Sequence, residues 1–278
     1  MTGVQTCALP IFLTDIDDTI KPMDSPAVPQ EAIDAFRAAM RAGIVVGPAS
    51  ARGYAWIRDY FDGSEDCCAT ALATNGSEVY LTGERIYAAD LAASDLQAVR
   101  EYVAGISGAG LLVFDDAGTP LLVEGALEDL EVAFPAYARA SRPVDGIPGF
   151  DIVKAGVFIA EDREGTWAFV DELNERFDVF DFDYPKPGWS NIMPAGWNKG
   201  AAIRFLAERI GASLDEVVIF GDAGNDIPMF EVVPNSVAVA NATPAAAAAA
   251  RWHIGPCEDH AVATAIQELA RGAWPFVE

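Results

Sequence analysis

Four aspartates in this 278-residue chain follow apolar runs and could bind a metal ion or react with a substrate. Asp15 and Asp17 directly follow an apolar run, and Asp222 and Asp226 follow another one far later in the chain. Side chains two positions apart on extended backbone point the same way, so Asp15 and Asp17 are expected to crowd one spot with the other two. Crowded carboxylates raise one another's pKa unless a hard cation with oxygen ligands joins them. The pattern therefore predicts a Mg²⁺ site.

Groups suited to an anion accompany these carboxylates. Lys199 lies in the first turn of a predicted helix that Asn198 caps and Gly211 ends, and a helix N-terminus favours negative charge. Ser50 is expected to begin a second helix, so that its hydroxyl and the following amides form another anion-binding cradle. Carboxylates, a metal, a lysine and such donors together suit phosphoryl transfer. An attacking aspartate would form an aspartyl-phosphate and divide the displacement into two steps.

The elements that must position these residues are predicted from short apolar runs alternating with amphipathic segments, a pattern typical of a Rossmann-like open parallel sheet. The expected strands of this α/β core are 11–15, 44–46, 68–73, 217–220 and 237–239. Ligands of such sheets bind beyond the carboxyl ends of the strands. The acidic residues and Ser50 fall at those ends, so the fold is expected to gather them.

An inserted α+β domain interrupts the parallel pattern. We predict that residues 12–87 and 188–278 form the core and that residues 88–187 form the insertion, with a hinge at 185–188. Residues 1–11 are set apart as a non-native lead-in, because the run from Val4 resembles the translation of a common sequencing-adapter stretch.

Four stretches resemble the motifs of the haloacid dehalogenase-like (HAD-like) hydrolase superfamily. They are Asp15-Ile16-Asp17-Asp18-Thr19, Ser50 after a strand, Asn198-Lys199-Gly200, and Gly221-Asp222-Ala223-Gly224-Asn225-Asp226. The 35 positions from Asp15 to Ser50 leave no room for a cap, whereas the 149 positions from Ser50 to Lys199 hold a large one. This placement resembles the Cof-like phosphatases, whose α/β cap lies between motifs two and three. The resemblance implies a HAD-like core with 88–187 as its cap domain.

The resemblance also implies roles for the residues that bear the chemistry. Asp15 would be the nucleophile and a metal ligand. Asp17 would act as acid and base and offer its backbone carbonyl to the metal, and Asp222 would complete the Mg²⁺ shell. One departure from the family pattern falls in this motif, where Asp18 stands in place of the usual glycine.

A second group of residues is implied to hold the phosphoryl group. Ser50, Ala51 and Lys199 would bind its oxygens, and Lys199 counts among the catalytic residues. Asn225 would contact phosphate, and Asp226 would orient either Lys199 or a metal-bound water. The second departure lies here, because Ser50-Ala51-Arg52 replaces the usual Thr-Gly-Arg.

The resemblance implies a Mg²⁺-dependent phosphatase, a phosphoric monoester hydrolase acting on small phosphorylated metabolites such as a sugar phosphate or a cofactor phosphate. One alternative is a phosphomutase or phosphotransferase that uses the same intermediate and delivers the phosphoryl group to a sugar. Another is a catalytically silent binding module that keeps the fold. Product analysis separates the first two, and the intact set of reacting groups argues against the third.

The charge balance limits the partners of the protein. Eighteen Lys and Arg face 42 Asp and Glu, which gives a net charge of −24. Nucleic-acid backbones and acidic lipid surfaces need a basic patch, which is missing from the sequence. We therefore expect a small phosphorylated metabolite as the ligand, with no nucleic acid, membrane or obligate protein partner. The sequence also lacks an apolar run of membrane-spanning length, so we expect a cytoplasmic protein.

Overall fold

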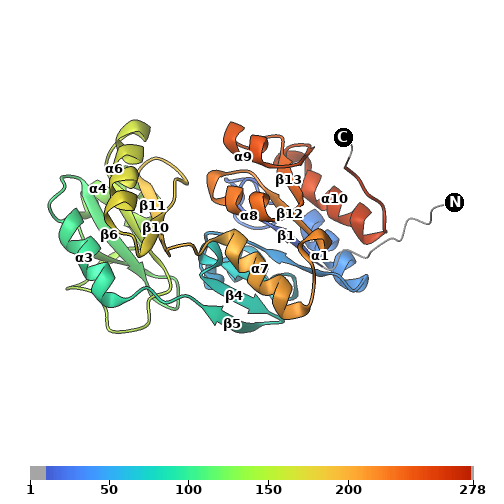
Figure 1. Ribbon diagram of the computed structural model, residues 1–278, viewed down its shortest axis with the longest axis horizontal. Coiled ribbons are helices and arrows are strands. Elements are labelled where there is room, and N and C mark those ends of the chain that lie inside the picture. Colours follow the sequence, from blue (N-terminus) through green and yellow to red (C-terminus); the bar gives the residue numbers. More distant parts are fainter. Residues whose placement is uncertain (1–10, 277–278) are drawn as a thin grey trace. The chain divides into compact units, whose positions relative to one another are not determined.

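The computed structural model describes residues 11–276, which form two units. The core unit comprises the described residues up to Ile86 and from Asn198 onward, and the cap unit comprises Tyr87–Trp197 (Figure 1). Residues 1–10, where most of the predicted non-native lead-in falls, lie outside the described residues. Ile11, the last residue of that predicted segment, begins the first strand, where it pairs with both neighbouring strands.

The core unit is built on a five-stranded parallel sheet with the order β14-β13-β12-β1-β2. Its strands are β1 (Ile11–Thr14), β2 (Val45–Pro48), β12 (Val217–Gly221), β13 (Asn235–Val239) and β14 (Trp252–Ile254). β1 is buried along its whole length, as expected for a central strand of a parallel sheet covered on both faces. The predicted parallel sheet is confirmed.

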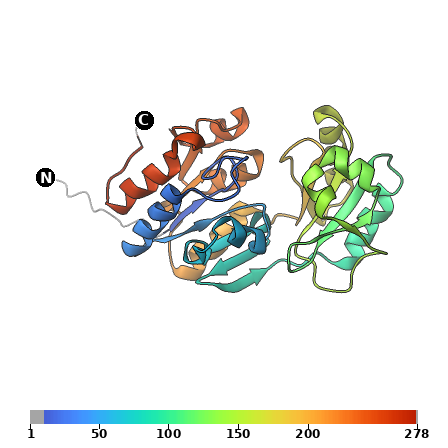
Figure 2. The ribbon, with the colours of Figure 1, turned by 180° about the vertical axis from the view of Figure 1, so that it is seen from behind.

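Helices of the core unit cover the sheet (Figures 1 and 2). They are α1 (Gln30–Arg41), α2 (Tyr54–Tyr60), α7 (Lys199–Ile210), α8 (Ile227–Val232), α9 (Pro244–Ala249) and α10 (Ala261–Ala270). α1 and α10 pack against each other. Phe36 of α1 and Ile266 of α10 share one apolar core with Phe12, Val218 and Phe220, the residues of β1 and β12 that point to that face.

A small three-stranded sheet contacts β2 through its first strand. It is formed by residues that follow β2 in the sequence and lead into the cap unit. It has the order β3-β4-β5, with β3 (Ala71–Ala73), β4 (Glu78–Leu81) and β5 (Glu84–Ala88). The sequence predicts 68–73 as a further strand of the parallel sheet, and here the structure differs. β3 pairs antiparallel with β4 and meets β2 through a parallel bridge between Ala49 and Leu72.

The cap unit is an α+β domain with a six-stranded sheet in the order β10-β11-β9-β6-β7-β8. The strands are β6 (Ala109–Phe114), β7 (Pro120–Glu124), β8 (Arg142–Pro143), β9 (Ala155–Ile159), β10 (Phe180–Phe182) and β11 (Trp189–Pro194). Its helices are α3 (Ala93–Val103), α4 (Leu127–Ala133), α5 (Pro135–Ala140) and α6 (Arg163–Arg176). Val99 of α3 and Val170 of α6 are fully buried in one core with Leu111 and Val157 of the sheet.

The second boundary of the cap unit differs from the prediction of 88–187 for the cap and 188–278 for the core. β11 pairs antiparallel with β9 and β10, so the chain returns to the core unit after Trp197. The predicted hinge at 185–188 instead connects β10 to β11, and Lys186 forms a bridge with Trp189. The reason is burial, because five of the six residues of β11 are buried and the strand lies between β10 and β9 in the cap sheet.

Within the part of the chain that the structure describes, no helix combines the length and apolarity needed to cross a bilayer.

Candidate active site

The carboxyl ends of three adjacent parallel strands hold the first group of site residues. Asp15 follows β1, and its amide donates to the carbonyl of Phe220 on β12 at 2.9 Å. Asp222 follows β12, and Ser50 follows β2. Because β1 lies between β2 and β12, these residues meet at one edge of the sheet.

The start of α7 holds Lys199 in place. The Asn198 side chain accepts from the amide of Ala201 at 3.1 Å, and Gly211 ends the helix in the left-handed region with φ 74°, which confirms both predicted ends. A Cβ on Gly200 would stand 2.3 Å from the Pro228 carbonyl oxygen. Close packing against α8 therefore fixes the first turn of α7 and the lysine it carries.

Lys199 is fully buried between two carboxylates. Its Nζ lies 2.6 Å from Asp15 Oδ1 and 2.6 Å from Asp226 Oδ1. Burial acts to lower the lysine pKa, but the charges of Asp15 and Asp226 outweigh it and raise this pKa above its ordinary value. The ammonium therefore remains charged, and the structure brings together three residues from distant parts of the sequence.

Asp226 uses both carboxylate oxygens within the protein. Oδ1 contacts Lys199, and Oδ2 accepts from the amides of Asp222 and Ala223 at 2.9 and 3.0 Å. A Cβ at Gly221 would lie 2.6 Å from Asp226 Cγ, so this close approach requires glycine. Of the two partners considered for Asp226, Lys199 is the one that its carboxylate contacts.

Three carboxylates gather where a cation could bind. Asp15, Asp222 and Asp226 each offer an oxygen, and these atoms lie within 4.8 Å of one another. Burial raises the pKa of Asp15 well above its ordinary value, with Lys199 opposing and the two neighbouring aspartates adding to the rise. Burial and Asp226 raise the pKa of Asp222 to about 7. This excess of negative charge and its hard oxygen donors fit a divalent cation such as Mg²⁺.

Asp17 turns its carboxylate toward two cations, which corrects the expectation that all four carboxylates converge. Its Oδ1 lies 3.0 Å from Lys21 Nζ, and its Oδ2 lies 2.9 Å from Arg52 Nε. Burial acts to raise the pKa of Asp17, but the charges of Arg52 and Lys21 together lower it. Two opposite charges in contact therefore draw this side chain out of the acidic group.

Ser50 is buried at the end of β2, where its Oγ accepts from the Arg52 amide at 3.2 Å. The prediction that Ser50 begins a helix is wrong, because α2 begins at Tyr54 after Gly53. Ala51 is not among the non-glycine residues of the described chain with positive φ. Alanine therefore fits this loop, although the family pattern has glycine there.

Asp18, which stands in place of the glycine usual in the family, has a backbone conformation that accounts for this difference. Its φ of 59° lies in the left-handed region, which glycine adopts freely and aspartate tolerates better than most residues. Its Oδ1 accepts from the Met23 amide at 2.9 Å, and its carbonyl accepts from Asn241 Nδ2 at 2.7 Å. These contacts hold the turn in a left-handed conformation, which is open to glycine as well as to aspartate.

Asn225 lies beside a second strained turn. Its Nδ2 donates to Asn75 Oδ1 at 3.2 Å, and Asn75 has a φ of 53° within the 3₁₀ turn Thr74–Gly76. A Cβ at Gly76 would lie 2.6 Å from the Cβ of Ala202 on α7. The turn that follows β3 is thus packed against the lysine-bearing helix.

Sequence reasoning missed two residues that touch this site. Thr19 Oγ1 donates to Asp222 Oδ1 at 2.7 Å, and Lys21 pairs with Asp17. Thr19 belongs to the first motif, and a partner for Asp222 could have been sought there. Lys21 is one of only four lysines in the sequence and lies four positions after Asp17, which was an available signal.

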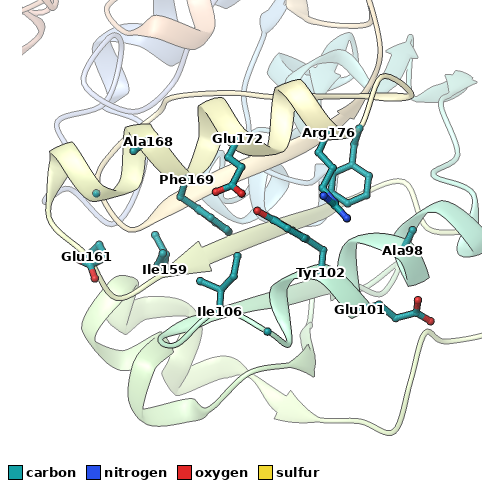
Figure 3. Close-up of a pocket in the computed structure, with 13 residues that line it drawn as sticks. Ala98, Glu101, Tyr102, Ile106, Ile159, Glu161, Ala168, Phe169, Glu172 and Arg176 are labelled. Atoms are coloured by element: carbon teal, nitrogen blue, oxygen red, sulfur yellow. The ribbon is translucent and has the colours of Figure 1, made fainter.

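The cap unit has a pocket of its own, which contains none of the predicted site residues. Its volume is about 1010 Å³, and it lies between α3 and α6 (Figure 3). Tyr102 and Phe169 line it, and the Arg176 guanidinium lies 4.6 Å from the centre of the Tyr102 ring. All of the predicted site residues belong to the core unit.

Comparison with known proteins identifies the family. The family model described as haloacid dehalogenase-like hydrolase matches residues 12–266, and the chain belongs to this family. The resemblance seen in the sequence motifs is therefore confirmed, and with it the HAD-like fold of a core and a cap.

Individual relatives agree with this assignment. SMU.1108c from Streptococcus mutans has a TM-score of 0.83 at 18% identity, covering 93% of this chain and 98% of that one. The HAD subclass IIB sugar phosphatase BT4131 has a TM-score of 0.77 at 18% identity, with the same coverage. These two likenesses concern the fold.

Curated relatives match over shorter stretches. An HMP-PP phosphatase of Klebsiella pneumoniae is 28% identical over 176 residues, which are 62% of this chain and 63% of that protein. The match spans less than two thirds of the length of this relative and of several others, among them the putative phosphatase YxeH of Bacillus subtilis, of which it spans 47%.

Proposed function

We propose that the protein is a Mg²⁺-dependent phosphatase that hydrolyses small phosphate monoesters through an aspartyl-phosphate on Asp15. The observation that carries this proposal is the buried arrangement of Lys199 between Asp15 and Asp226, with an Asp222 oxygen within 4.8 Å of the other two carboxylates. A charged lysine beside crowded carboxylates suits a phosphoryl group and its counter-cation.

In the first step Asp15 attacks phosphorus. Its Oδ1 contacts Lys199, so Oδ2 is the oxygen assigned to form the new P–O bond. The bond from phosphorus to the alcohol oxygen breaks, and a proton from Asp17 neutralises the departing alkoxide. Lys199, the Ser50 hydroxyl, the amide at Ala51 and the Asn225 side chain would donate to the phosphoryl oxygens, which carry the developing charge.

In the second step Asp17 acts as the base. It takes a proton from a water molecule, which attacks the aspartyl-phosphate and releases inorganic phosphate and free Asp15. Arg52 and Lys21 favour the ionised form of Asp17, which suits this step. In the first step the negative charge of the bound phosphoryl group favours the protonated form. The same carboxyl thus serves both halves of the reaction.

Asp15, Asp222 and the backbone carbonyl of Asp17 are the groups proposed to hold Mg²⁺. Asp226 already gives both oxygens to Lys199 and two amides, so its proposed role is to position the lysine. When bound, the cation would neutralise part of the charge on the phosphoryl group and the carboxylates. Removal of the cation should therefore restore repulsion between the nucleophile and its substrate.

The substrate class is proposed from the names of the relatives. One is an HMP-PP phosphatase, and a fold relative is a sugar phosphatase. We infer a small phosphorylated metabolite, either a sugar phosphate or a cofactor phosphate. The phosphomutase alternative differs only in the acceptor, and the silent module differs in having no turnover.

The test is release of inorganic phosphate from an aryl phosphate and from a panel of sugar and cofactor phosphates, with and without a chelator. We expect turnover that stops on chelation and returns with added Mg²⁺. Activity that survives complete metal removal would contradict the metal requirement. A phosphorylated sugar product without free phosphate would favour the mutase, and no turnover on any ester would favour the silent module.

A further inference from the structure

Lys21 is a buried cation that contacts Asp17 from within the same turn. Its side chain is 1% exposed, and its Nζ lies 3.0 Å from Asp17 Oδ1. The same ammonium donates to the carbonyls of Pro22 and Ser25 at 3.2 and 3.1 Å and lies 4.8 Å from the centre of the Tyr60 ring. Burying an ammonium is costly unless such partners compensate it, so these contacts fix its position.

The two oxygens of Asp17 are held from two different elements. Lys21 belongs to the same tight turn as Asp17, in which the Asp18 amide donates to the Lys21 carbonyl at 2.7 Å and the Lys21 amide donates to the Ile16 carbonyl at 2.9 Å. Arg52 comes from the loop after β2, and its side chain is 18% exposed. Lys21 is therefore the more deeply buried of the two anchors and the one tied to the nucleophile's own turn.

We propose that Lys21 is a positioning residue that holds the Asp17 carboxyl where it can reach the leaving oxygen of the phosphate ester. The inference rests on the proposed function, since it concerns the same site. Without the Lys21 contact, the carboxyl keeps one partner on Arg52 and can rotate about its side-chain bonds. A displacement of about 1 Å at a reacting group can cost on the order of 10²-fold in rate.

The experiment compares Lys21→Met with the wild type on phosphate monoesters whose leaving groups range from acidic phenols to alkyl alcohols. kcat/KM reports the steps up to cleavage of the ester bond, so hydrolysis of the aspartyl-phosphate does not affect it. Esters of acidic phenols need little protonation of the leaving oxygen, whereas alkyl esters depend on it. We expect losses of about 10²-fold for alkyl esters and less than about threefold for the most acidic phenol.

Two further variants complete the design. Lys21→Arg keeps the charge and should restore part of the alkyl-ester activity, giving a dependence on leaving-group pKa between those of the wild type and Lys21→Met. Arg58→Met removes an exposed ion pair with Glu65 in the same unit and should leave that dependence unchanged. Thermal unfolding of each variant identifies those that fold, and Lys21→Arg carries the test if Lys21→Met does not.

The outcomes separate the inference from the proposed function. A steeper dependence on leaving-group pKa in the Lys21 variants supports the inference. An equal loss for all esters assigns Lys21 a merely structural role and overturns it, as does unchanged activity. A wild-type protein that hydrolyses none of the esters overturns the proposed function and the inference together.

Discussion

The two units of this molecule use their interiors differently. The core unit buries Asp15, Lys199 and Asp226 at the edge of its parallel sheet, where each charge contacts an opposite one. The cap unit buries an apolar layer between its sheet and two helices, represented by Val99 and Val170. Buried charges need partners at fixed distances, whereas apolar side chains need only matching volume. The core unit is therefore the part whose geometry is suited to precise chemistry.

The cap pocket sharpens this contrast. The pocket is large, but the lining residue whose pKa is shifted is a tyrosine. Burial and a hydrogen bond to Glu172 raise the pKa of Tyr102 to about 12. In the core unit, carboxyls have raised pKa values beside a charged lysine. Shifted pKa values among groups that can exchange protons or attack phosphorus indicate a reactive site better than pocket volume does.

The largest effect is expected from Asp15→Asn in the core unit. The amide is a far poorer nucleophile than a carboxylate, so kcat should fall by at least about 10³-fold. Steady-state release of phosphate measures this. Wild-type turnover in this variant would contradict the assignment of the reactive groups to the core unit.

A smaller loss is expected for Lys199→Met. The variant removes the donor to the phosphoryl group and leaves two carboxylates facing each other, so kcat/KM should fall by about 10² to 10³-fold. Lys199→Arg should not rescue it, because a longer, planar guanidinium is not expected to reproduce one nitrogen held 2.6 Å from both Asp15 Oδ1 and Asp226 Oδ1. Full rescue by arginine would show that charge alone matters here.

Asp226→Ala tests whether the core site also holds the fold together. Lys199 loses one partner, and the amides of Asp222 and Ala223 lose their shared acceptor. Breaking a buried ion pair costs about 3 kcal/mol or more in the free energy of unfolding. Chemical denaturation measures the loss, and an unchanged unfolding midpoint would contradict the packing described here.

The smallest effect is expected in the cap pocket. Tyr102→Phe removes the hydroxyl that bonds Glu172 and keeps the ring beneath Arg176. Activity on an aryl phosphate should change less than about twofold, and the free energy of unfolding should shift by roughly 0.5 kcal/mol or less. A loss comparable to that of Lys199→Met would place reactive chemistry in the cap unit and remove the distinction between the units.

Several features of the fold were predictable because their signals are local. The limits of α7 follow from Asn198 and Gly211, and β1, β2, β12 and β13 follow from short apolar runs, whereas β14 was not predicted. The membership of β11 in the cap sheet was not predictable in this way. Ser190 and Asn191 interrupt the apolar residues of this strand, so the sequence pattern predicts no strand there, and only its pairing with β9 and β10 places it in the cap sheet.

The sequence by itself determined the types of reacting groups, their order and their places at strand ends, because motifs and strand patterns depend on residues that are adjacent in the sequence. Only the tertiary structure decided which charges meet: Lys199 with Asp15 and Asp226, and Asp17 with Lys21 and Arg52. Lys21 lies only four positions after Asp17, but the other partners are far apart in the chain and are brought together by the order of strands in the sheet and the packing of α7. Contacts of this kind depend on three-dimensional distances, which no local pattern records.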